Sequence, residues 1–456
     1  MNLFIGRKEE LDVLQEQYVR NQFEFTVIYG RRRVGKTTLI QEFIENKKVI
    51  YFQAVEANAK TNLELFSAAI TQSISSPVYE SFTKAFEAIT ECATREKIVL
   101  IIDEFPYLAS AEKSTSSLLQ RFIDQKWKNM DFQLILCGSS MSFMEKQVLG
   151  AKSPLYGRRT AQLKIEPFTF EETREFFPTI DSEKAFDFFA ITGGIPQYLK
   201  FVNPQCSVFE TIEALFFKRG GALVEEPSNL LKQELKDSAT YMSILEAIAT
   251  GSSKMNEIST KTGIETSNLS TRLVSLIELG LVEKVYPVGN EKSKNTMYKI
   301  KDNMFRFWYR FVFPNQTLLF VGRRKELLDF VEQNFNDFCA PVFENFSRRW
   351  VVQHSSYMLR SIGSWWGTKT KERGQEEIDI LGIDISGNQA VFGECKWRNE
   401  KTDTKVVRTL LERANLFSYT NKELYVFSRN TFTEGAAEFA NENHVVLVTF
   451  AEMTTY

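Results

Sequence analysis

The amino-acid sequence predicts a multi-domain α/β protein that begins with a parallel sheet covered by helices on both faces. Three observations lead to this fold class. The chain has 456 residues, which exceeds the size of one hydrophobic core, so that about two to four domains are expected. Unbroken apolar runs alternate with helix-like stretches in the first third, as in parallel sheets buried on both faces. From about residue 238 a different order of elements begins.

Five short apolar runs form the predicted parallel strands of the first domain, residues 1–168. Stretches with helical spacing of apolar and charged residues separate them, and RKEELDVLQEQYVR at 7–20 is the first helix. The five runs are FEFTVIY (23–29), KVIYFQAV (48–55), KIVLIIDEF (97–105), FQLILCGSS (132–140) and AQLKIEPF (161–168). The segment 169–235 that follows is predicted to be helical throughout and to form a lid.

A pattern of three helices and a hairpin occupies residues 236–315. The helices are predicted from YMSILEAIA, KMNEISTKTG and ETSNLSTRLVSLIELG. The next segment, LVEKVYPVGNEKSKNTMYKI, has the pattern of two strands joined by a polar loop with Gly289 and Asn290 at its tip. This order is typical of a winged helix-turn-helix. The aromatic run at 303–313 is expected to pack between domains, and residues 320–456 form a last α/β unit.

Composition and charge favour an ordinary globular protein of the cytoplasm. Hydrophobic residues make up 43% of the chain, and the formal net charge of −2 does not support a polyanion-binding surface over the whole protein. The N-terminus lacks the apolar run of a signal peptide, and no run of about 18 apolar residues predicts a membrane span. The five scattered cysteines and two histidines indicate neither a disulfide framework nor a His-rich metal site.

The segment YGRRRVGKTT at 29–38 contains the pattern Gly-x-x-x-x-Gly-Lys-Thr between an apolar strand and a helix start. Glycines let backbone N–H groups approach phosphate oxygens, and the helix N-terminus adds favourable partial charge. The lysine reaches the outer phosphates of ATP, and the threonine hydroxyl completes a Mg²⁺ shell. The alternative is a plain Gly-rich turn. The predicted ATP-binding residues are Gly30, Arg31, Arg32, Arg33, Val34, Gly35, Lys36, Thr37 and Thr38, together with Asp103 and Ser139.

The run IVLIIDEF ends in Asp103 and Glu104 and supplies the partner site. Asp103 and Thr37 are the predicted Mg²⁺ ligands, and Glu104 is predicted to orient or deprotonate the attacking water. The strand 48–55 lies between the two motifs in sequence. An inserted strand with an adjacent glutamate is the layout of the additional-strand, catalytic-glutamate class of P-loop ATPases. The alternative for the acidic pair is a solvated strand edge.

Polar residues after the later strands are further candidates. In CGSS, Ser139 or Ser140 can sense the γ-phosphate. In SPLYGRRT, Arg158 or Arg159 can stabilise transition-state charge, either within the chain or from a neighbouring subunit, and the alternative is a helix-capping or surface pair. An arginine acting in trans is compatible with a homo-oligomer. The segment TGGIPQYL at 192–199 fits either a hinge that closes the lid or a plain helix break.

Six motifs in this order resemble the archaeal-type ATPases, a branch of the AAA+/STAND group. They are FIGRKEELDVL, YGRRRVGKTTLI, LIIDEFPYL, GSSMSFM, SPLYGRRT and GGIPQYL, and they span about residues 1–200. The resemblance implies that Gly194 and Pro196 belong to the lid. Many members of the family carry a winged helix and then a domain that resembles restriction endonucleases, so that the resemblance covers nearly the whole chain.

The stretch EEIDILGIDISGNQAVFGECKW at 376–397 places acids on two predicted strands joined by a tight turn. Residues two apart in a strand share a face, so Glu394 and Lys396 point the same way, and a hairpin brings Asp379 beside Glu394. The two carboxylates are predicted to bind Mg²⁺, while Lys396 helps to activate water. With Glu344 on an earlier helix, this is the pattern of PD-(D/E)xK nucleases. The alternatives are an exposed charged strand and a family fold kept as a binding module.

The third helix of the winged-helix segment offers polar residues for a partner. Leu269, Leu273, Leu276 and Ile277 have core spacing, whereas Ser267, Asn268, Ser270, Thr271 and Arg272 are expected to face outward. Lys292 and Lys294 add positive charge in the loop. Because glutamates nearly balance the cations of residues 250–300, contact with DNA and contact with a protein partner are equally supported.

The leading hypothesis is an ATP-dependent switch. The first domain binds ATP together with Mg²⁺ and hydrolyses the ATP slowly. The nucleotide state repositions the winged helix and gates a nuclease-like domain that acts on DNA. The alternative is a nucleotide-gated scaffold or DNA-binding regulator with an inactive nuclease fold. A metabolic P-loop kinase is disfavoured, because it leaves no place for the winged helix.

Overall fold

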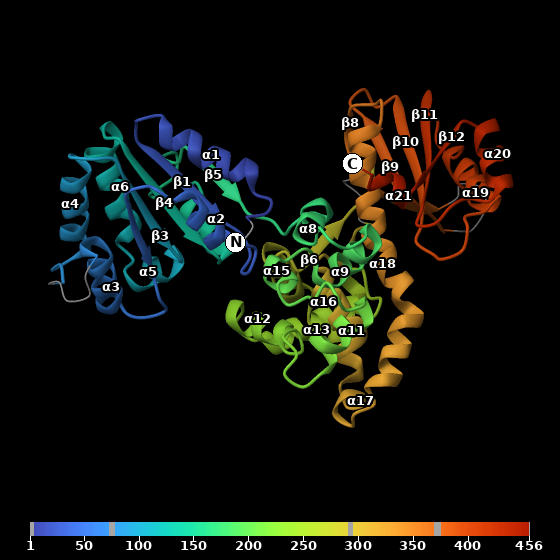
Figure 1. Cartoon of the computed structure of the whole chain (residues 1–456), viewed down its shortest axis with the longest axis horizontal. Helices are drawn as coiled ribbons and strands as arrows, with labels where there is room; N and C mark the ends of the chain where they lie inside the picture. The colour runs from blue at the N-terminus through green and yellow to red at the C-terminus, as the bar shows by residue number, and fades with distance from the viewer. Residues whose placement is uncertain (1–3, 73–77, 291–294, 369–374, 456) are drawn as a thin grey trace. The chain divides into compact units, whose positions relative to one another are not determined.

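The computed structural model describes residues 4–72, 78–290, 295–368 and 375–455, and the chain divides into two compact units (Figure 1). The first unit consists of residues 1–176 and 194–200, and the second of residues 177–193 and 201–456. The chain therefore leaves the first unit, returns to it for seven residues, and then continues into the second. The domain borders at residues 168, 235 and 315 stay predictions.

A five-stranded parallel sheet forms the centre of the first unit, in agreement with the apolar runs. The strands are β1 (Glu24–Tyr29), β2 (Val49–Gln53), β3 (Ile98–Asp103), β4 (Phe132–Gly138) and β5 (Ala161–Lys164). Their order in the sheet is β2-β3-β4-β1-β5. The sequence predicts an inserted strand at 48–55, but this strand, β2, lies at the edge. It is β4 that separates β1 from β3.

Helices cover both faces of this sheet (Figure 1). α1 and α2 lie on one face of the sheet, and α3 to α6 lie on the other (Figure 1). Alternate residues of each strand point to opposite sides, so each strand contributes side chains to both faces. On the second face, Phe25 and Val27 of β1 join one core with Phe66 and Phe86. The helices of the unit are α1 (Lys8–Val19), α2 (Lys36–Phe43), α3 (Ala59–Thr71), α4 (Phe82–Ala93), α5 (Phe105–Ala111), α6 (Thr115–Gln125), α7 (Met141–Phe143), α8 (Phe170–Phe176) and α10 (Pro196–Leu199).

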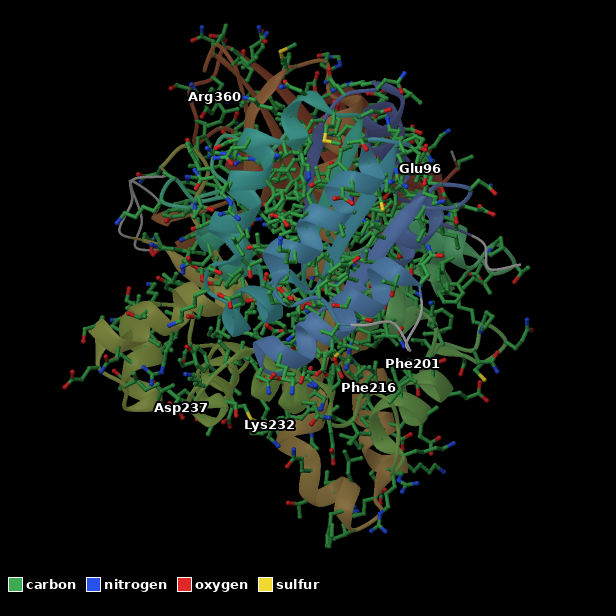
Figure 2. The ribbon with its side chains drawn as sticks, turned by 90° about the vertical axis from the view of Figure 1, so that its left-hand side faces the viewer. Glu96, Phe201, Phe216, Lys232, Asp237 and Arg360 are labelled. Carbon is green, nitrogen blue, oxygen red and sulfur yellow. The ribbon has the colours of Figure 1, made fainter. Side chains whose placement is uncertain are left out.

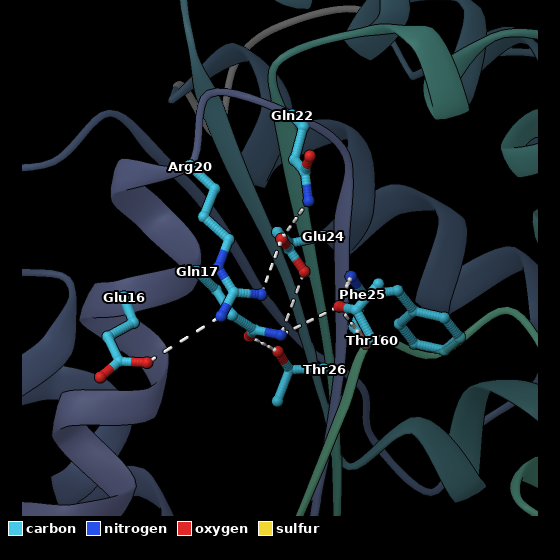
Figure 3. A network of polar contacts seen from close by, with 8 residues as sticks. All are labelled: Glu16, Gln17, Arg20, Gln22, Glu24, Phe25, Thr26 and Thr160. Carbon is cyan, nitrogen blue, oxygen red and sulfur yellow. Dashed lines mark hydrogen bonds and ion pairs between the residues drawn. The ribbon is translucent and has the colours of Figure 1, made fainter.

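A buried polar network fastens α1 to the start of β1 (Figure 3). Glu24 is fully buried, and its carboxylate accepts hydrogen bonds from Gln17 Nε2 at 3.2 Å and Gln22 Nε2 at 2.8 Å. The Gln17 amide also donates to Thr160 Oγ1 at 2.9 Å and accepts from Thr26 Oγ1. Since buried polar groups are costly unless they are paired, the network fixes the position of α1 on the sheet.

The second unit begins with helices, in agreement with the predicted helical segment. These are α9 (Ser182–Thr192), α11 (Val208–Ile212) and α12 (Glu226–Glu234). Figure 2 labels Phe216, which is buried in the π-helical turn Glu213–Phe217 after α11, and Lys232, which is exposed on α12. Three helices and an antiparallel pair of strands follow: α13 (Ser238–Ala249), α14 (Met255–Thr262), α15 (Thr266–Glu278), β6 (Val282–Val285) and β7 (Met297–Ile300).

The helix α15 buries three of the four residues expected to form its core face. Leu269, Leu273 and Leu276 are buried, but Ile277 is 37% exposed. Ile277 follows Leu276 directly, so the helical rotation of about 100° per residue turns it toward the rim of the buried stripe. The loop lysines Lys292 and Lys294 lie outside the described residues.

The aromatic run at 303–313 packs between the helical segment and the C-terminal part of the second unit. It forms α16 (Asn303–Phe307), a π-helical turn and a 3₁₀ turn. The Phe307 ring lies 4.6 Å from that of Phe216 and 5.4 Å from that of Phe338, measured between centroids. Trp308 Nε1 donates to the Val224 carbonyl at 2.8 Å. This agrees with the expected packing role.

A mixed five-stranded sheet closes the second unit, with the order β12-β11-β10-β9-β8. β8 to β10 are antiparallel, and β10 to β12 are parallel. The elements are α17 (Gln316–Phe320), α18 (Arg324–His354), β8 (Leu359–Thr368), β9 (Gln375–Asp384), β10 (Gln389–Lys396), α19 (Thr404–Ala414), β11 (Asn421–Ser428), α20 (Glu434–Glu442), β12 (Val445–Thr449) and α21 (Phe450–Met453).

The loop after β6 packs on this mixed sheet. Val288 is 8% exposed and belongs to one hydrophobic core with Ile378, Leu381 and Ile383 of β9. Its backbone N–H donates to the Ser364 carbonyl of β8 at 3.1 Å. The hairpin β6–β7 is therefore joined to the C-terminal sheet by apolar packing. Among the described residues, no helix is both long enough and apolar enough to cross a membrane.

We expect Gln17→Ala to lower the free energy of unfolding of the first unit by about 2–4 kcal/mol, because it leaves Glu24 and Thr26 short of partners in a buried site. The measurement is guanidinium denaturation followed by circular dichroism, fitted with a separate transition for each unit. Gln22→Ala is the control. Gln22 also donates to Glu24 but is exposed, so we expect a loss below about 0.5 kcal/mol. Equal losses in both variants would contradict the assigned role.

Candidate functional sites

The loop between β1 and α2 has the backbone of a phosphate-binding loop. Gly30 and Gly35 have φ of 154° and 92°, and a Cβ on Gly30 would clash with the Ile165 carbonyl oxygen. Lys36 begins α2 and is 7% exposed. Its Nζ donates to the carbonyls of Gly30 at 2.8 Å and Arg31 at 2.9 Å. The ammonium group is thus held inside the loop that would surround the phosphates.

Asp103 ends β3 and faces the start of α2. Thr37 Oγ1 lies 3.4 Å from Asp103 Oδ2, so a hydroxyl and a carboxylate oxygen meet there, which is the donor chemistry that Mg²⁺ prefers. Asp103 Oδ2 also accepts from the Tyr51 hydroxyl at 2.6 Å, and burial together with this bond raises the pKa of Tyr51. The sequence did not single out Tyr51. The signal for it is a tyrosine within an otherwise apolar strand.

Glu104 follows Asp103 with φ of 49°, a conformation that is uncommon for a residue with a side chain. Its Oε2 accepts from the Ser139 backbone N–H at 3.2 Å and from Ser139 Oγ at 2.9 Å. Ser139 follows β4, which is the neighbour of β3, and it is 4% exposed. The predicted water-orienting acid is therefore held by the predicted γ-phosphate sensor.

The other predicted nucleotide residues lie around the same loop. The Arg32 Nη2 group donates to the Tyr107 hydroxyl at 2.8 Å, and the Arg33 guanidinium lies 5.9 Å from the Tyr198 ring centroid. The Val34 carbonyl accepts from Arg7 at 3.3 Å. Thr38 is exposed in the first turn of α2, next to Thr37.

Arg158 lies at the other end of the sheet. It donates to both carboxylate oxygens of Asp124 at 2.8 and 2.7 Å, and its Nη1 donates to the carbonyls of Pro154 and Tyr156. Thr160, two residues later, contacts Phe25 at the start of β1. The phosphate-binding loop follows the opposite end of β1, about 20 Å away. Arg158 does not reach that loop within its own chain.

In the second unit, the structure brings Asp379 and Glu394 together. β9 and β10 are antiparallel with Ile380 opposite Gly393, so the next pair along the strands is Asp379 and Glu394. Asp379 Oδ2 accepts from the Cys395 backbone N–H at 2.9 Å. Lys396 Nζ donates to Glu394 Oε1 at 2.7 Å, so these two side chains share a face as predicted.

Glu344 of α18 contributes to the same cluster through Arg348. Arg348 Nη2 donates to Glu344 Oε2 at 3.1 Å, and Arg348 Nε and Nη2 donate to the Asp379 carbonyl at 3.1 and 3.0 Å. Burial raises the pKa of Asp379 to about 7, and the negative charges of Glu394 and Glu344 act in the same direction. Burial also raises the pKa of Glu344.

Three residues of this cluster, Arg348, Glu376 and Arg413, were not predicted from the sequence. Arg413 of α19 donates from Nη1 to Glu394 Oε2 at 2.7 Å and from Nε to Glu376 Oε2 at 3.1 Å. Both oxygens of Glu394 therefore contact cations, and Glu394 is only 5% exposed. Although burial acts to lower it, the pKa of Lys396 is raised by Glu394 and Asp379.

Metal binding at this cluster depends on few protein ligands. In the part of the chain that the structure describes, no group of three or more His, Cys, Asp or Glu side chains is placed to hold a metal ion. Mg²⁺ in proteins commonly binds through one or two carboxylates with waters and substrate phosphates. The pair Asp379 and Glu394 fits that donor set.

We expect Asp379→Asn to raise the melting temperature of the metal-free protein relative to the wild type, increasingly as the pH rises. The pKa of Asp379 is about 7 in the folded chain, whereas an unfolded aspartate has a pKa near 3.9. Between these values only the folded state holds the proton, so wild-type stability falls as pH rises from about 4 to 7. Asparagine mimics the protonated acid and removes this fall.

The control is Asp384→Asn in the same strand. Hydrogen bonds, above all from Ser386, lower the pKa of Asp384 to about 2, so its contribution is present above about pH 4 and is lost only as the pH falls toward 2. This variant should melt at a lower temperature by a nearly constant amount between about pH 5 and 8. A flat difference between Asp379→Asn and the wild type over that range would exclude the raised pKa.

Comparisons with known proteins agree with the first site. A family model described as an ATPase domain predominantly from Archaea matches residues 4–202. A second model, described as archaeal and bacterial proteins of unknown function, matches residues 308–407. A Walker-type ATPase of Pyrococcus abyssi has a solved structure with a TM-score of 0.51 and 20% identity, covering 67% of this chain and 96% of its own. At that identity the likeness concerns the fold.

Two curated proteins of Methanocaldococcus jannaschii are closer in sequence. An uncharacterized ATP-binding protein is 51% identical over 47 residues, which are 10% of this chain and 80% of that protein. An uncharacterized protein is 34% identical over 431 residues, which are 93% of this chain and 94% of the relative. Together with the matched ATPase domain, this full-length similarity shows that the chain belongs to the archaeal-type family of P-loop ATPases.

Proposed function

We propose that the protein is an ATP-dependent switch in which the first unit binds ATP with Mg²⁺ and hydrolyses it. The carrying observation is that Lys36, Thr37, Asp103 and Glu104 meet at the carboxyl ends of two strands of one parallel sheet. The loop amides and Lys36 bind the phosphates, and Thr37 and Asp103 hold the metal ion, which neutralises charge on the phosphates. Glu104 orients the attacking water.

The contact between Ser139 and Glu104 defines the resting state in this proposal. Ser139 Oγ is 2.9 Å from Glu104 Oε2, so the acid is turned toward the end of β4. A γ-phosphate near Ser139 competes for the same hydroxyl and leaves Glu104 free to take a water. Hydrolysis then begins only after ATP has bound, which fits a slow switch.

Arg158 acts in trans in this proposal. Its distance from the loop of its own chain and its bidentate pair with Asp124 are compatible with a role at the nucleotide of a neighbouring copy. A homo-oligomer would then complete the site.

The five cysteines are free, which supports the assignment to a reducing cytoplasm.

We propose that the second unit carries a winged helix and a metal-dependent nuclease domain of the restriction-endonuclease type. Asp379 and Glu394 would hold Mg²⁺, which lowers the pKa of bound water and stabilises phosphate charge. Lys396 positions the water, and Arg348 orients Glu344. The helices α13 to α15 with β6 and β7 form the winged helix, and Ser267, Asn268, Ser270 and Thr271 of α15 are exposed for contact with DNA.

Communication between the two sites is proposed to run through Gly193 and Gly194, where the chain crosses from one unit to the other. Both glycines have positive φ. A Cβ on Gly35 of the phosphate loop would lie 3.9 Å from Pro196, and a Cβ on Gly193 would lie 3.5 Å from the Asn303 backbone nitrogen of α16. A change at the loop thus has a short path to the aromatic packing of the second unit.

A second candidate function is a nucleotide-gated scaffold or regulator whose nuclease fold is inactive. Two observations favour it. Both oxygens of Glu394 are paired with cations of the chain, and Val288 packs the loop of the hairpin against the mixed sheet. In that case DNA or a protein partner binds through α15 without being cut.

We expect Lys36→Ala to weaken ATP binding by about 100-fold, because it removes the cation that contacts the phosphates. Glu104→Gln should bind ATP with wild-type affinity and hydrolyse it about 100-fold more slowly. The measurements are titration with a fluorescent ATP analogue and phosphate release. Glu91→Gln, at an exposed position of α4, is the control and should behave as the wild type. Unchanged ATP binding in Lys36→Ala would refute the site.

Cleavage of supercoiled plasmid with Mg²⁺ or Mn²⁺, with and without ATP, tests the second half of the proposal. We expect Lys396→Ala to lose at least about 100-fold in rate, because Lys396 contacts Glu394 and the water site. Lys36→Ala should abolish the effect of ATP, and Lys405→Ala at an exposed position of α19 should change nothing. If no metal or nucleotide supports cutting while ATP is still hydrolysed, the scaffold function is favoured instead.

A further inference from the structure

The second site contains an arginine whose position requires an explanation. Along α19, Val406, Leu410 and Arg413 have the spacing of one helical face, and the first two are buried in the core against the mixed sheet. Arg413 lies one turn after Leu410 on that face, next to the buried Ala414 that ends the helix. A charged side chain there is costly unless it is paired, and its pairs are with Glu394 and Glu376.

The charges of the cluster are nearly balanced without a metal ion. Among the described residues, the carboxylates are Glu344, Asp379, Glu394 and Glu376, and the cations that donate to them or to their backbone are Arg348, Lys396 and Arg413. These four described acids and three described cations sum to one negative charge when all four acids are ionised. A divalent cation that binds to Asp379 and Glu394 must therefore compete with Lys396 and Arg413, which already pair with Glu394.

We propose that Arg413 is a positioning residue that exchanges partners, holding Glu394 when the site is empty and binding a phosphate of the DNA backbone when Glu394 binds the metal ion. This inference rests on the proposed nuclease function. A guanidinium group donates equally well to a carboxylate and to a phosphate, and Arg413 makes one bond to Glu394, from Nη1, so the same side chain can serve both states. Its Nε bond to Glu376 at 3.1 Å keeps the side chain beside the site during the exchange. Metal and DNA then bind cooperatively.

The exchange predicts that removing Arg413 tightens metal binding in the absence of DNA. In Arg413→Gln, Mn²⁺ measured by titration calorimetry should bind at least about tenfold more tightly than in the wild type, because Glu394 loses a charge-assisted competitor. At saturating Mn²⁺, KM for plasmid cleavage should rise about tenfold and kcat should change less. The Mn²⁺ affinity and the KM of Arg413→Lys should lie between those of the wild type and of Arg413→Gln, because lysine keeps the positive charge but lacks the planar guanidinium group.

Two controls separate the exchange from simpler explanations. Arg408→Gln lies on the same helix, is exposed, and stacks on Phe439 at 4.9 Å, so its Mn²⁺ affinity should be unchanged. The double variant Arg413→Gln with Glu376→Gln keeps the net charge of the wild type. If it still binds Mn²⁺ more tightly, competition for Glu394 is responsible; if its affinity returns to the wild-type value, net charge alone explains the effect and the exchange is overturned.

The outcomes also separate this inference from the nuclease proposal. Suppose that the wild-type protein binds Mn²⁺ and cleaves DNA. Unchanged or weaker Mn²⁺ binding in Arg413→Gln then overturns the exchange of partners and leaves the nuclease proposal intact. Tighter Mn²⁺ binding without cleavage by any variant supports the role of Arg413 at Glu394 and removes the nuclease. If neither the wild type nor Arg413→Gln binds Mn²⁺, both the exchange and the nuclease proposal are wrong. A melting curve of the metal-free Arg413→Lys protein establishes that at least one variant is folded.

Discussion

The position of β4 between β1 and β3 is the constraint on which the nucleotide site depends. Neighbouring strands lie about 4.8 Å apart, so the strand that precedes the phosphate loop and the strand that ends in Asp103 are separated by about 10 Å. That gap is wide enough for phosphates and a hydrated metal ion, and Thr37 and Asp103 still meet across it at 3.4 Å. Because β4 lies between β1 and β3, the residue that follows it, Ser139, is placed beside Glu104 and contacts it.

A different constraint governs the second unit, where acids and cations are clustered on two interior strands of the mixed sheet, β9 and β10. The hairpin of β9 and β10 brings Asp379 and Glu394 together, and repulsion between them adds to burial in raising the pKa of Asp379. Ion pairs offset this repulsion: Lys396 and Arg413 pair with Glu394, and Arg348 pairs with Glu344. The chain thus supplies cations that offset this repulsion in the absence of a metal ion.

Local patterns in the sequence determined which parts of this architecture could be predicted. The phosphate loop and the acid pair are contiguous, and Asp379 and Glu394 are joined by one short turn, so spacing alone placed them. The sheet order was missed, because pairing of parallel strands is decided by packing between distant segments. Arg413 and Val288 were missed for the same reason. The available signals were a charge at an apolar helix position and an apolar residue near a polar loop tip.

Each group that awaits a ligand in this chain already has an internal partner. Lys36 donates to the carbonyls of Gly30 and Arg31, Glu104 accepts from Ser139, and Glu394 accepts from Lys396 and Arg413. Binding at either site is therefore an exchange of partners, and its net free energy is smaller than the new contacts alone would give. Weak binding to one ligand makes occupancy sensitive to a second ligand that draws the internal partner away. Sites built in this way respond to combinations of ligands, and that is the physical property that a switch requires.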